Sequence, residues 1–168
     1  MSTGKFEETQ QRMSRAVDLD PNFGMAYTVM ASAARNLGRQ QDAEKYIREA
    51  LKHIDRMTER ERYRTRAYLY LLTSDHQKCV DEYGALLEKY PSDSGAFTNL
   101  SVCQMYLHNV PKALDAARRA VEILPKRAAY RGNLAMNLAF SGDSQGAAKE
   151  AAQTLLNGFQ LSVLIPIC

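Results

Sequence analysis

The stretch of sequence that decides the fold is FTNLSVCQMYLHNVPKALDAARRAVEILP, residues 97–125. It holds two amphipathic segments in which apolar residues return every three to four positions, the spacing of one face of an α-helix. The polar turn His108-Asn109-Val110 separates them. Pro125 ends the second segment, because proline has no amide hydrogen and cannot continue a helix. These features predict two antiparallel helices joined by a short turn.

The same pattern recurs along most of the chain. Its small residue at the start of the second helix lies at Ala43, Cys79, Ala113 and Ala147, giving separations of 36, 34 and 34 by subtraction. Its closing position lies at Pro21, Asp55, Pro91 and Pro125, giving separations of 34, 36 and 34. Both series agree on a repeat of about 34 residues, with a two-residue insertion near Met57. Such a period predicts helix pairs stacked into a solenoid.

Turn and capping signals divide the chain into repeats. We expect repeats at residues 24–55, 58–91, 94–125 and 128–156, a half-repeat at 4–21 that supplies only a second helix, and an apolar tail at 157–168. Thr58 and Glu61 fit a capping box, in which each side chain binds the other residue's backbone amide at a helix start. Ser74 with Gln77 is a second candidate box. We therefore expect an all-α solenoid up to about residue 156.

The repeated residues are typical of one repeat family. In the third full repeat they are Phe97, Leu100, Ser101, Gln104, Ala113, Ala117, Ala120 and Pro125. This pattern resembles the tetratricopeptide repeat (TPR), although Arg66 replaces a leucine in the second repeat and Arg131 replaces an aromatic residue in the fourth. The resemblance implies a right-handed superhelical solenoid of antiparallel helix pairs. It also implies that the first helices line a concave groove for a peptide or protein segment.

Composition and motifs exclude several other classes. Of the 168 residues, 45% are hydrophobic, the net charge is +3, and no apolar run has the length of a membrane span. Nucleotide-binding, serine-hydrolase, zinc-protease and kinase motifs do not occur in the sequence, so we predict a non-catalytic chain without a cofactor. His53, His76 and His108 lie far apart in the array, so no metal site is expected. The three cysteines are widely spaced and predict free thiols, with Cys79 buried and Cys168 exposed.

Five arginines lie close together around the start of the second repeat, at Arg56, Arg60, Arg62, Arg64 and Arg66. A nucleic-acid-binding surface needs a one-sided basic face with aromatic residues for stacking. Here Glu59 and Glu61 each lie three residues before an arginine, a spacing that predicts the ion pairs Glu59–Arg62 and Glu61–Arg64 along the helix. We interpret the cluster as a solvated helix face and do not expect nucleic acid as a partner.

The TPR resemblance assigns candidate groove residues slot by slot. They are Thr28, Ser32, Asn36, Arg64, Tyr68, Asn99, Val102, Tyr106, Asn133, Met136 and Phe140. Asn99 and Asn133 occupy equivalent slots of successive repeats, where an amide offers donors and an acceptor to a ligand's backbone. The alternative is that both are only exposed polar residues. Because Arg64 is the sole basic residue of the set, we do not expect the terminal carboxylate that some relatives bind.

A finer resemblance concerns Thr58-Glu-Arg-Glu-Arg-Tyr63, Asp81-Glu-Tyr83 and Lys89-Tyr-Pro91. These residues resemble the repeat region that follows the kinase domain in bacterial eukaryote-like serine/threonine kinases. The resemblance implies that the chain is a sensor or docking fragment of a larger signalling protein. It favours the cytoplasm, or the periplasm if the parent is a membrane receptor kinase.

Two functions remain open at this stage. One is a scaffold that binds a peptide or protein segment in its groove. The other is self-association into a homo-oligomer through the terminal helices or the tail. A half-repeat leaves the apolar stripe of Phe6, Met13 and Val17 only half covered, and residues 159–168 (FQLSVLIPIC) are apolar.

Overall fold

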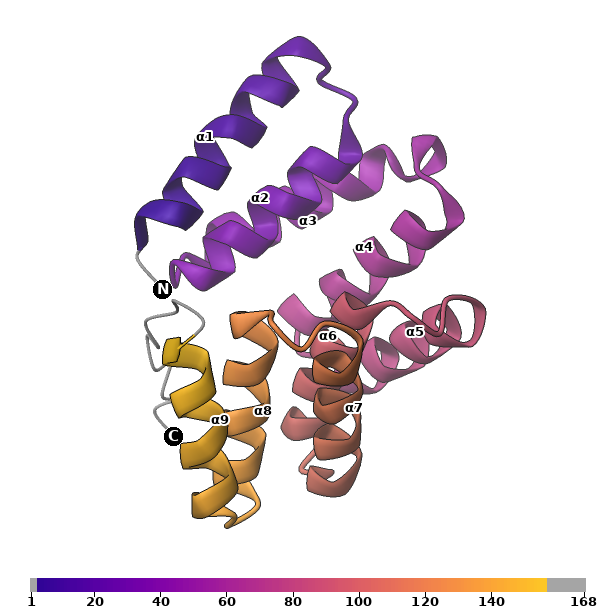
Figure 1. Ribbon diagram of the computed structural model, residues 1–168. Coiled ribbons are helices and arrows are strands. Elements are labelled where there is room, and N and C mark those ends of the chain that lie inside the picture. Colours follow the sequence, from indigo (N-terminus) through magenta and orange to yellow (C-terminus); the bar gives the residue numbers. More distant parts are fainter. Residues whose placement is uncertain (1–2, 157–168) are drawn as a thin grey trace.

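The computed structural model describes residues 3–156, which form nine α-helices and one 3₁₀ segment and contain no strand (Figure 1). The helices are α1 (Thr3–Leu19), α2 (Gly24–Asn36), α3 (Gln40–Lys52), α4 (Glu59–Leu72), α5 (His76–Lys89), α6 (Ser94–Tyr106), α7 (Val110–Ile123), α8 (Ala128–Phe140) and α9 (Ser144–Leu156). The all-α prediction is confirmed. No helix among these residues is both long and apolar enough to cross a membrane. The predicted tail, residues 157–168, lies outside the described residues.

The same kind of turn closes the first helix of each full pair. The second residue after each of α2, α4, α6 and α8 has a left-handed backbone. These residues are Gly38 (φ 74°), Ser74 (φ 62°), His108 (φ 56°) and Gly142 (φ 87°). The next amide donates to the carbonyl five residues earlier, as from Arg39 to Ala34 at 2.9 Å, which caps the helix end. Only glycine adopts this conformation without a Cβ penalty, so Ser74 and His108 are the strained members of the set.

The two extra residues of the first full repeat form part of a 3₁₀ segment, Ile54–Arg56, just before α4. The capping box at Thr58 is confirmed: its hydroxyl accepts from the Glu61 amide at 3.4 Å, and its own amide donates to Glu61 Oε2 at 2.9 Å. The second box, at Ser74, is wrong. Ser74 takes the left-handed turn position, and Asp75 caps α5 by accepting from the Lys78 amide at 3.3 Å.

Small residues allow the helices of a pair to pack closely. Ala31, Ala67 and Ser101 are fully buried, and larger side chains such as Ile47 and Tyr83 fill the space between pairs. One buried cluster extends from α2 to α6, and a smaller one joins α7 to α8. Each cluster joins helices of neighbouring pairs, so each pair depends on its neighbours, as in a solenoid.

The two arginines that depart from the repeat pattern bind acidic groups on the second helix of their own pair. Arg66 Nε donates to Glu82 Oε1 at 2.9 Å, and its guanidinium lies 4.9 Å from the centre of the Tyr63 ring. Arg131 Nη1 donates to Glu150 Oε2 at 2.5 Å. An ion pair between α4 and α5, and another between α8 and α9, thus take the place of apolar contacts.

The prediction of free thiols is wrong for two of the cysteines. Cys79 of α5 and Cys103 of α6 form a disulfide, with Cα atoms 6.2 Å apart, and both residues are fully buried. The bond joins the second helix of one repeat to the first helix of the next. The spacing of 24 residues carries no disulfide motif, and the two sulfurs meet only because α5 packs on α6. Cys168 lies outside the described residues.

Candidate functional site: the inner face

The first helices of the pairs form one wall of the stack. Helices α2 and α4, α4 and α6, and α6 and α8 contact each other, whereas the second helices make no contacts of similar extent among themselves in the part that the structure describes. The stack is therefore curved (Figure 1). We call the side on which α2, α4, α6 and α8 meet the inner face. All predicted groove residues lie on these four helices.

The two candidate asparagines have different surroundings. Asn99 Nδ2 donates to the hydroxyl of Tyr83 at 2.9 Å, and the ring of Tyr83 is buried on α5. One repeat later the residue equivalent to Tyr83 is Ala117, and Asn133 Nδ2 donates to Ser101 Oγ at 2.6 Å instead. Both amide nitrogens are thus already engaged within the chain. The hydrogen bond of Asn133 joins α8 to α6 and so stabilises the fold.

Hydroxyl and amide contacts also engage the candidates on α2. The hydroxyl oxygens of Thr28 and Thr65 lie 3.1 Å apart and join α2 to α4, and Thr65 is completely buried. Asn36 Nδ2 donates to the carbonyl of Ser32 on its own helix at 2.8 Å. Thr28, Ser32 and Asn36 remain half-buried, so they present a polar surface at the start of the inner face.

Arg64, the one basic candidate, is bound to a buried carboxylate. Its Nε and Nη2 donate to Asp93 Oδ2 and Oδ1 at 2.9 and 2.5 Å, and Arg60 Nε donates to Oδ2 at 2.9 Å. Asp93 also caps α6 by accepting from the Ala96 amide at 2.9 Å. Burial by itself raises the pKa of Asp93, but the hydrogen bonds from Arg64, Ala96 and Arg60 outweigh it and hold the pKa below its usual value.

The ion pairs predicted within α4 are wrong. Among the described residues, Glu59 pairs with Lys89 of α5, and Glu61 binds the amide and hydroxyl of Thr58. The arginines bind acidic residues elsewhere along the chain: Arg56 lies 3.5 Å from Asp20, and Arg60 and Arg64 share Asp93. Most of the positive charge is thus neutralised across helix junctions, where sequence spacing gives no signal.

Tyr68 is not available to a ligand as the groove prediction requires, because only 6% of it is exposed. It belongs to the buried cluster between α2 and α6. Burial raises the pKa of its phenol, and the nearby Arg35 and Ser32 partly counteract that effect. Leu72, one turn further along α4, is also buried. The inner face therefore offers little apolar surface at α4.

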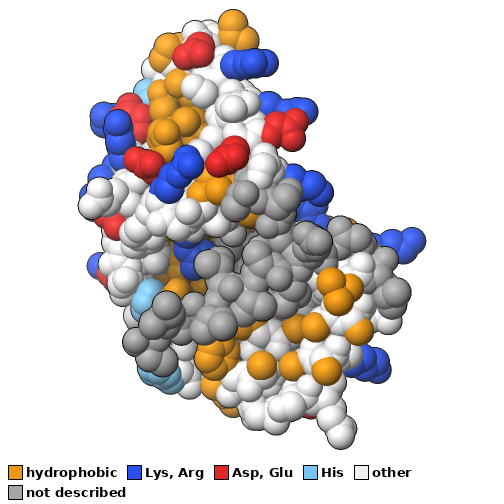
Figure 2. Space-filling model, turned by 90° about the vertical axis from the view of Figure 1, so that its left-hand side faces the viewer, with side chains coloured by type: hydrophobic (Ala, Val, Ile, Leu, Met, Phe, Trp, Pro, Cys, Tyr) orange, Lys and Arg blue, Asp and Glu red, His pale blue; other side chains and the backbone are white. Residues whose placement is uncertain are grey.

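The remaining four candidates form what we call the apolar block: Val102, Tyr106, Met136 and Phe140. Met136 is the equivalent of Val102 one repeat later, and Phe140 is the equivalent of Tyr106, so they occupy matching slots on the adjacent helices α6 and α8. Phe140 is 54% exposed and Tyr106 is 50% exposed. In the face shown in Figure 2, charged side chains concentrate in the upper half, and few interrupt the hydrophobic ones in the lower half, at the height of α8 and α9.

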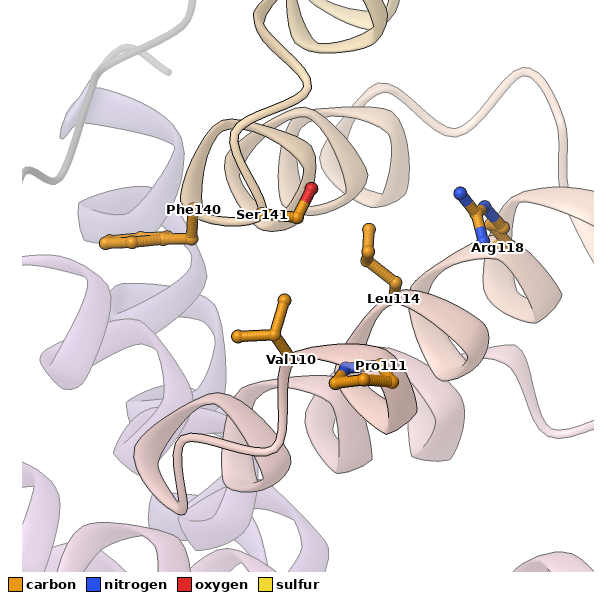
Figure 3. Close-up of a pocket in the computed structure, with 6 residues that line it drawn as sticks. All are labelled: Val110, Pro111, Leu114, Arg118, Phe140 and Ser141. Atoms are coloured by element: carbon orange, nitrogen blue, oxygen red, sulfur yellow. The ribbon is translucent and has the colours of Figure 1, made fainter.

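An open pocket of about 550 Å³ adjoins the block on one side. Val110, Pro111 and Leu114 of α7 line it together with Phe140 and Ser141 at the end of α8. Figure 3 shows the side chains of Val110 and Leu114 rising from α7 toward the α8 side, with Phe140 across from them. The exposed ring of Phe140 thus borders both the inner face and this hollow, which Arg118 also lines.

A second open pocket, of about 610 Å³, lies where α3 meets the turn after α4. Its lining includes Arg35, Arg48 and His76, and it touches Tyr106. The rings of His76 and Tyr106 are stacked with centroids 4.5 Å apart. Burial lowers the pKa of His76, so its ring is neutral near pH 7. His76 therefore supports the Tyr106 ring from behind as an uncharged platform.

The described residues contain no cluster of histidine, cysteine or acidic side chains suited to a metal ion. Sequence reasoning missed the residues that engage its candidates: Asp93, Tyr83 and, as a partner of Asn133, Ser101. A partial signal existed for Asp93, because a Ser-Asp-Ser run after Pro91 is a helix-start pattern. No such signal existed for the Tyr83 hydroxyl, because its contact with Asn99 depends on how α5 packs against α6.

With this geometry, the described chain has the fold of a TPR solenoid. Solved structures of such proteins superimpose on most of it. MamA from Desulfovibrio magneticus RS-1 is 19% identical, with a TM-score of 0.58 over 92% of this chain and 86% of that one. YrrB, a TPR protein with an unusual peptide-binding site, is 15% identical, with a TM-score of 0.56 over 93% and 79%.

The TPR2AB domain of yeast Sti1, solved in a complex with pHSP90, is also similar. It is 15% identical and has a TM-score of 0.56 over 92% of this chain and 72% of that one. At these identities the likeness establishes the fold. No protein-family model and no curated protein sequence matches the chain.

Proposed function

We propose that this chain is a non-catalytic scaffold that binds a peptide or protein segment along its inner face. The observation that carries the proposal is the apolar block, in which two aromatic side chains are about half exposed on adjacent helices. The polar residues around it bind each other, so they hold the wall in shape. Aromatic anchors beside a polar surround are typical of interaction sites.

Similar proteins support this proposal. YrrB has a peptide-binding site, and the Sti1 domain was solved with a protein partner. The sequence suggested Asn99 and Asn133 as the residues that bind the ligand. In the structure, the amide nitrogens of both already donate hydrogen bonds within the chain. We therefore assign recognition chiefly to Tyr106, Met136 and Phe140, together with the partly buried Val102.

We further propose that the chain is the sensor or docking part of a larger bacterial signalling protein, such as a serine/threonine kinase. The support is the resemblance of Thr58–Tyr63, with its capping box and two-residue insertion, to the repeat region of such kinases. The coding sequence around this segment tests the proposal, because a kinase domain upstream is expected.

A peptide-array screen followed by substitution tests the binding function. Phe140→Ala and Tyr106→Ala should each weaken a selected peptide by roughly tenfold, the effect of removing a moderate aromatic hot spot. Leu124→Ala is the matched control, because Leu124 is 45% exposed but follows α7 and lies outside the block. The control should change affinity less than twofold.

Asn99→Ala and Asn133→Ala complete the set. If the asparagines bind the ligand directly, these changes weaken binding as strongly as Phe140→Ala. We expect them to act mainly on stability, because each removes an internal hydrogen bond. If the protein and its Tyr106→Ala/Phe140→Ala variant bind the selected peptide with equal affinity, the apolar block is not the binding site.

Self-association is the second candidate, and exposed leucines near the two ends favour it. Leu19 at the end of α1 is 89% exposed, and Leu155 in α9 is 59% exposed. Light scattering over a range of concentrations, with and without residues 159–168, tests it. A monomer in both forms would remove this function and leave the scaffold.

A further inference from the structure

We infer that residues 157–168 of this chain dock on its own apolar block and compete there with an outside ligand. The inference rests on the proposed function, because it takes the block to be the ligand site. It names an occupant for a surface that residues 3–156 leave open.

The chemistry of the two partners matches. Residues 159–168, FQLSVLIPIC, contain no charged side chain, and the block consists of one valine, one methionine and two aromatic residues. The other end of the inner face is polar, at Ser32 and Asn36, and Arg35 and Arg48 line the second pocket, which meets the block at Tyr106. An uncharged apolar segment therefore gains most by covering the Met136 and Phe140 side of the block.

The spacing also matches. Pro166 biases the residue before it toward extended backbone, and Val163 and Ile165 are β-branched. In an extended chain, side chains two residues apart lie on one side at about 6.6 Å. Met136 and Phe140 are four residues apart on α8, about 6 Å along the helix axis. Val163 and Ile165 can thus cover Met136 and Phe140 together.

The tail is long enough to reach. Helices α8 and α9 pack as an antiparallel pair, so Leu156 lies near the level of Ala128 at the start of α8. Met136 is about 12 Å further along α8, and crossing from one helix to the next adds about 10 Å. An extended chain covers about 22 Å in seven residues, which brings Val163 to Met136. The segment then runs parallel to α8 toward Phe140.

A spin label on Cys168 of the full chain tests this docking without any outside ligand. Cys79 and Cys103 are buried and bonded to each other, so Cys168 is the thiol left for a nitroxide. We expect the label to broaden the NMR signal of the Met136 methyl group. The signals of Met13 on α1 and Met25 on α2, at the far end of the stack, should stay sharp.

Two substitutions sharpen the test. Ile165→Asp puts a charge on the side of the tail that faces the block, and Phe140→Ser removes one anchor, so both should abolish most of the broadening at Met136. Leu124→Ser, outside the block, should leave it unchanged. A sharp Met136 signal in the labelled parent protein would overturn the inference. So would broadening that appears only when spin-labelled and isotope-labelled molecules are mixed, because that places the tail on a second copy.

The competition has its own measurement. If the tail covers the block in most molecules, Ile165→Asp should tighten binding of an array-selected peptide by roughly tenfold, in proportion to the covered fraction. Unchanged affinity alongside a broadened Met136 signal would overturn the competition. If the tail does not dock, the Phe140→Ala test of ligand binding still applies. The two proposals can therefore be contradicted independently.

Discussion

Arg64 and Asp93 form a two-point contact across the junction of the second and third full repeats. Two guanidinium nitrogens of Arg64 donate to the two carboxylate oxygens of Asp93, whose side chain is fully buried. Arg60 donates a further hydrogen bond, and the same carboxylate caps α6. One carboxylate therefore binds two arginines and starts a helix, and this junction is expected to be the most sensitive to substitution.

Asp93→Ala should lower the free energy of unfolding by about 1–3 kcal/mol, because it removes the charge-assisted hydrogen bonds to two partly exposed arginines and a helix cap. Asp93→Asn keeps a capping side chain and should cost less by about 1 kcal/mol. Urea unfolding followed by circular dichroism measures both. Equal losses would show that the cap contributes nothing.

The same residue makes stability depend on pH. The pKa of Asp93 is lower in the folded protein than the value of about 3.9 that an unfolded chain has. Its stabilising effect is thus fully present above about pH 4 and is lost as the pH falls through the lower, folded-state pKa. Asp93→Asn should flatten this part of the curve of unfolding free energy against pH. An unchanged slope would assign the acid sensitivity to other groups.

Arg64→Met should destabilise the protein more than Arg60→Met. Arg64 donates two hydrogen bonds to Asp93, whereas Arg60 donates one and is the more exposed of the two. Each charge-assisted hydrogen bond contributes about 1.5–3 kcal/mol. Thermal melts of the two variants give the order directly, and the reverse order would contradict the two-point geometry.

Ala135→Leu should destabilise the protein by about 1–3 kcal/mol, because Ala135 lies in the close crossing of α8 and α9 and a larger side chain overpacks it. Ala148→Leu is the control, since Ala148 is exposed on α9. Differential scanning calorimetry compares them. Identical melting temperatures would show that the repeat register is misplaced.

His108→Gly should stabilise the protein by roughly 1 kcal/mol, because it removes the Cβ penalty of a left-handed residue. Gly38→Ala, at the equivalent turn of the first repeat, should destabilise it by a similar amount. No atom lies near the place of the added methyl group, so backbone conformation alone produces the loss. Chemical denaturation of both variants checks the signs, which must be opposite.

Reduction of Cys79–Cys103 should cost about 2–4 kcal/mol, the usual contribution of a disulfide that closes a loop of this size. Unfolding curves with and without reductant measure the difference. The Cys79→Ala/Cys103→Ala variant should show no response to reductant. Mass spectrometry under non-reducing conditions supplies the direct check, since two free thiols would add two hydrogens to the expected mass.

The repeat spacing, prolines and turn residues predicted the all-α stack, because these signals are local and recur four times. The site was harder to predict. Asn99 and Asn133 occupy the same slot in the sequence pattern, yet Tyr83 binds the first, and Ala117 in the equivalent place leaves the second to Ser101. A position in the repeat pattern predicts which face of a helix a side chain lies on. It does not predict the hydrogen-bond partner of that side chain, because the partner comes from another helix that packs nearby.

The predicted apolar groove residues differ in exposure for a physical reason. Tyr106, Met136 and Phe140 remain 36–54% exposed on α6 and α8. Tyr68 and Leu72 belong to the same series of slots but are buried with α2. The sequence pattern does not distinguish the two situations, because the difference lies in how closely α2 and α4 approach.

The contacts between successive inner helices also decide how the array responds to a pulling force. Tension applied at the two ends is transmitted in series, so the weakest junction yields first. The junction of the first and second full repeats has polar links such as the Thr28–Thr65 hydroxyl pair and the hydrogen bond from Gln40 to the Leu72 carbonyl, whereas the junction of the second and third repeats carries the Asp93 ion pairs and a covalent sulfur bridge. Under load the middle of the solenoid should keep its shape while the repeats on either side of it separate first.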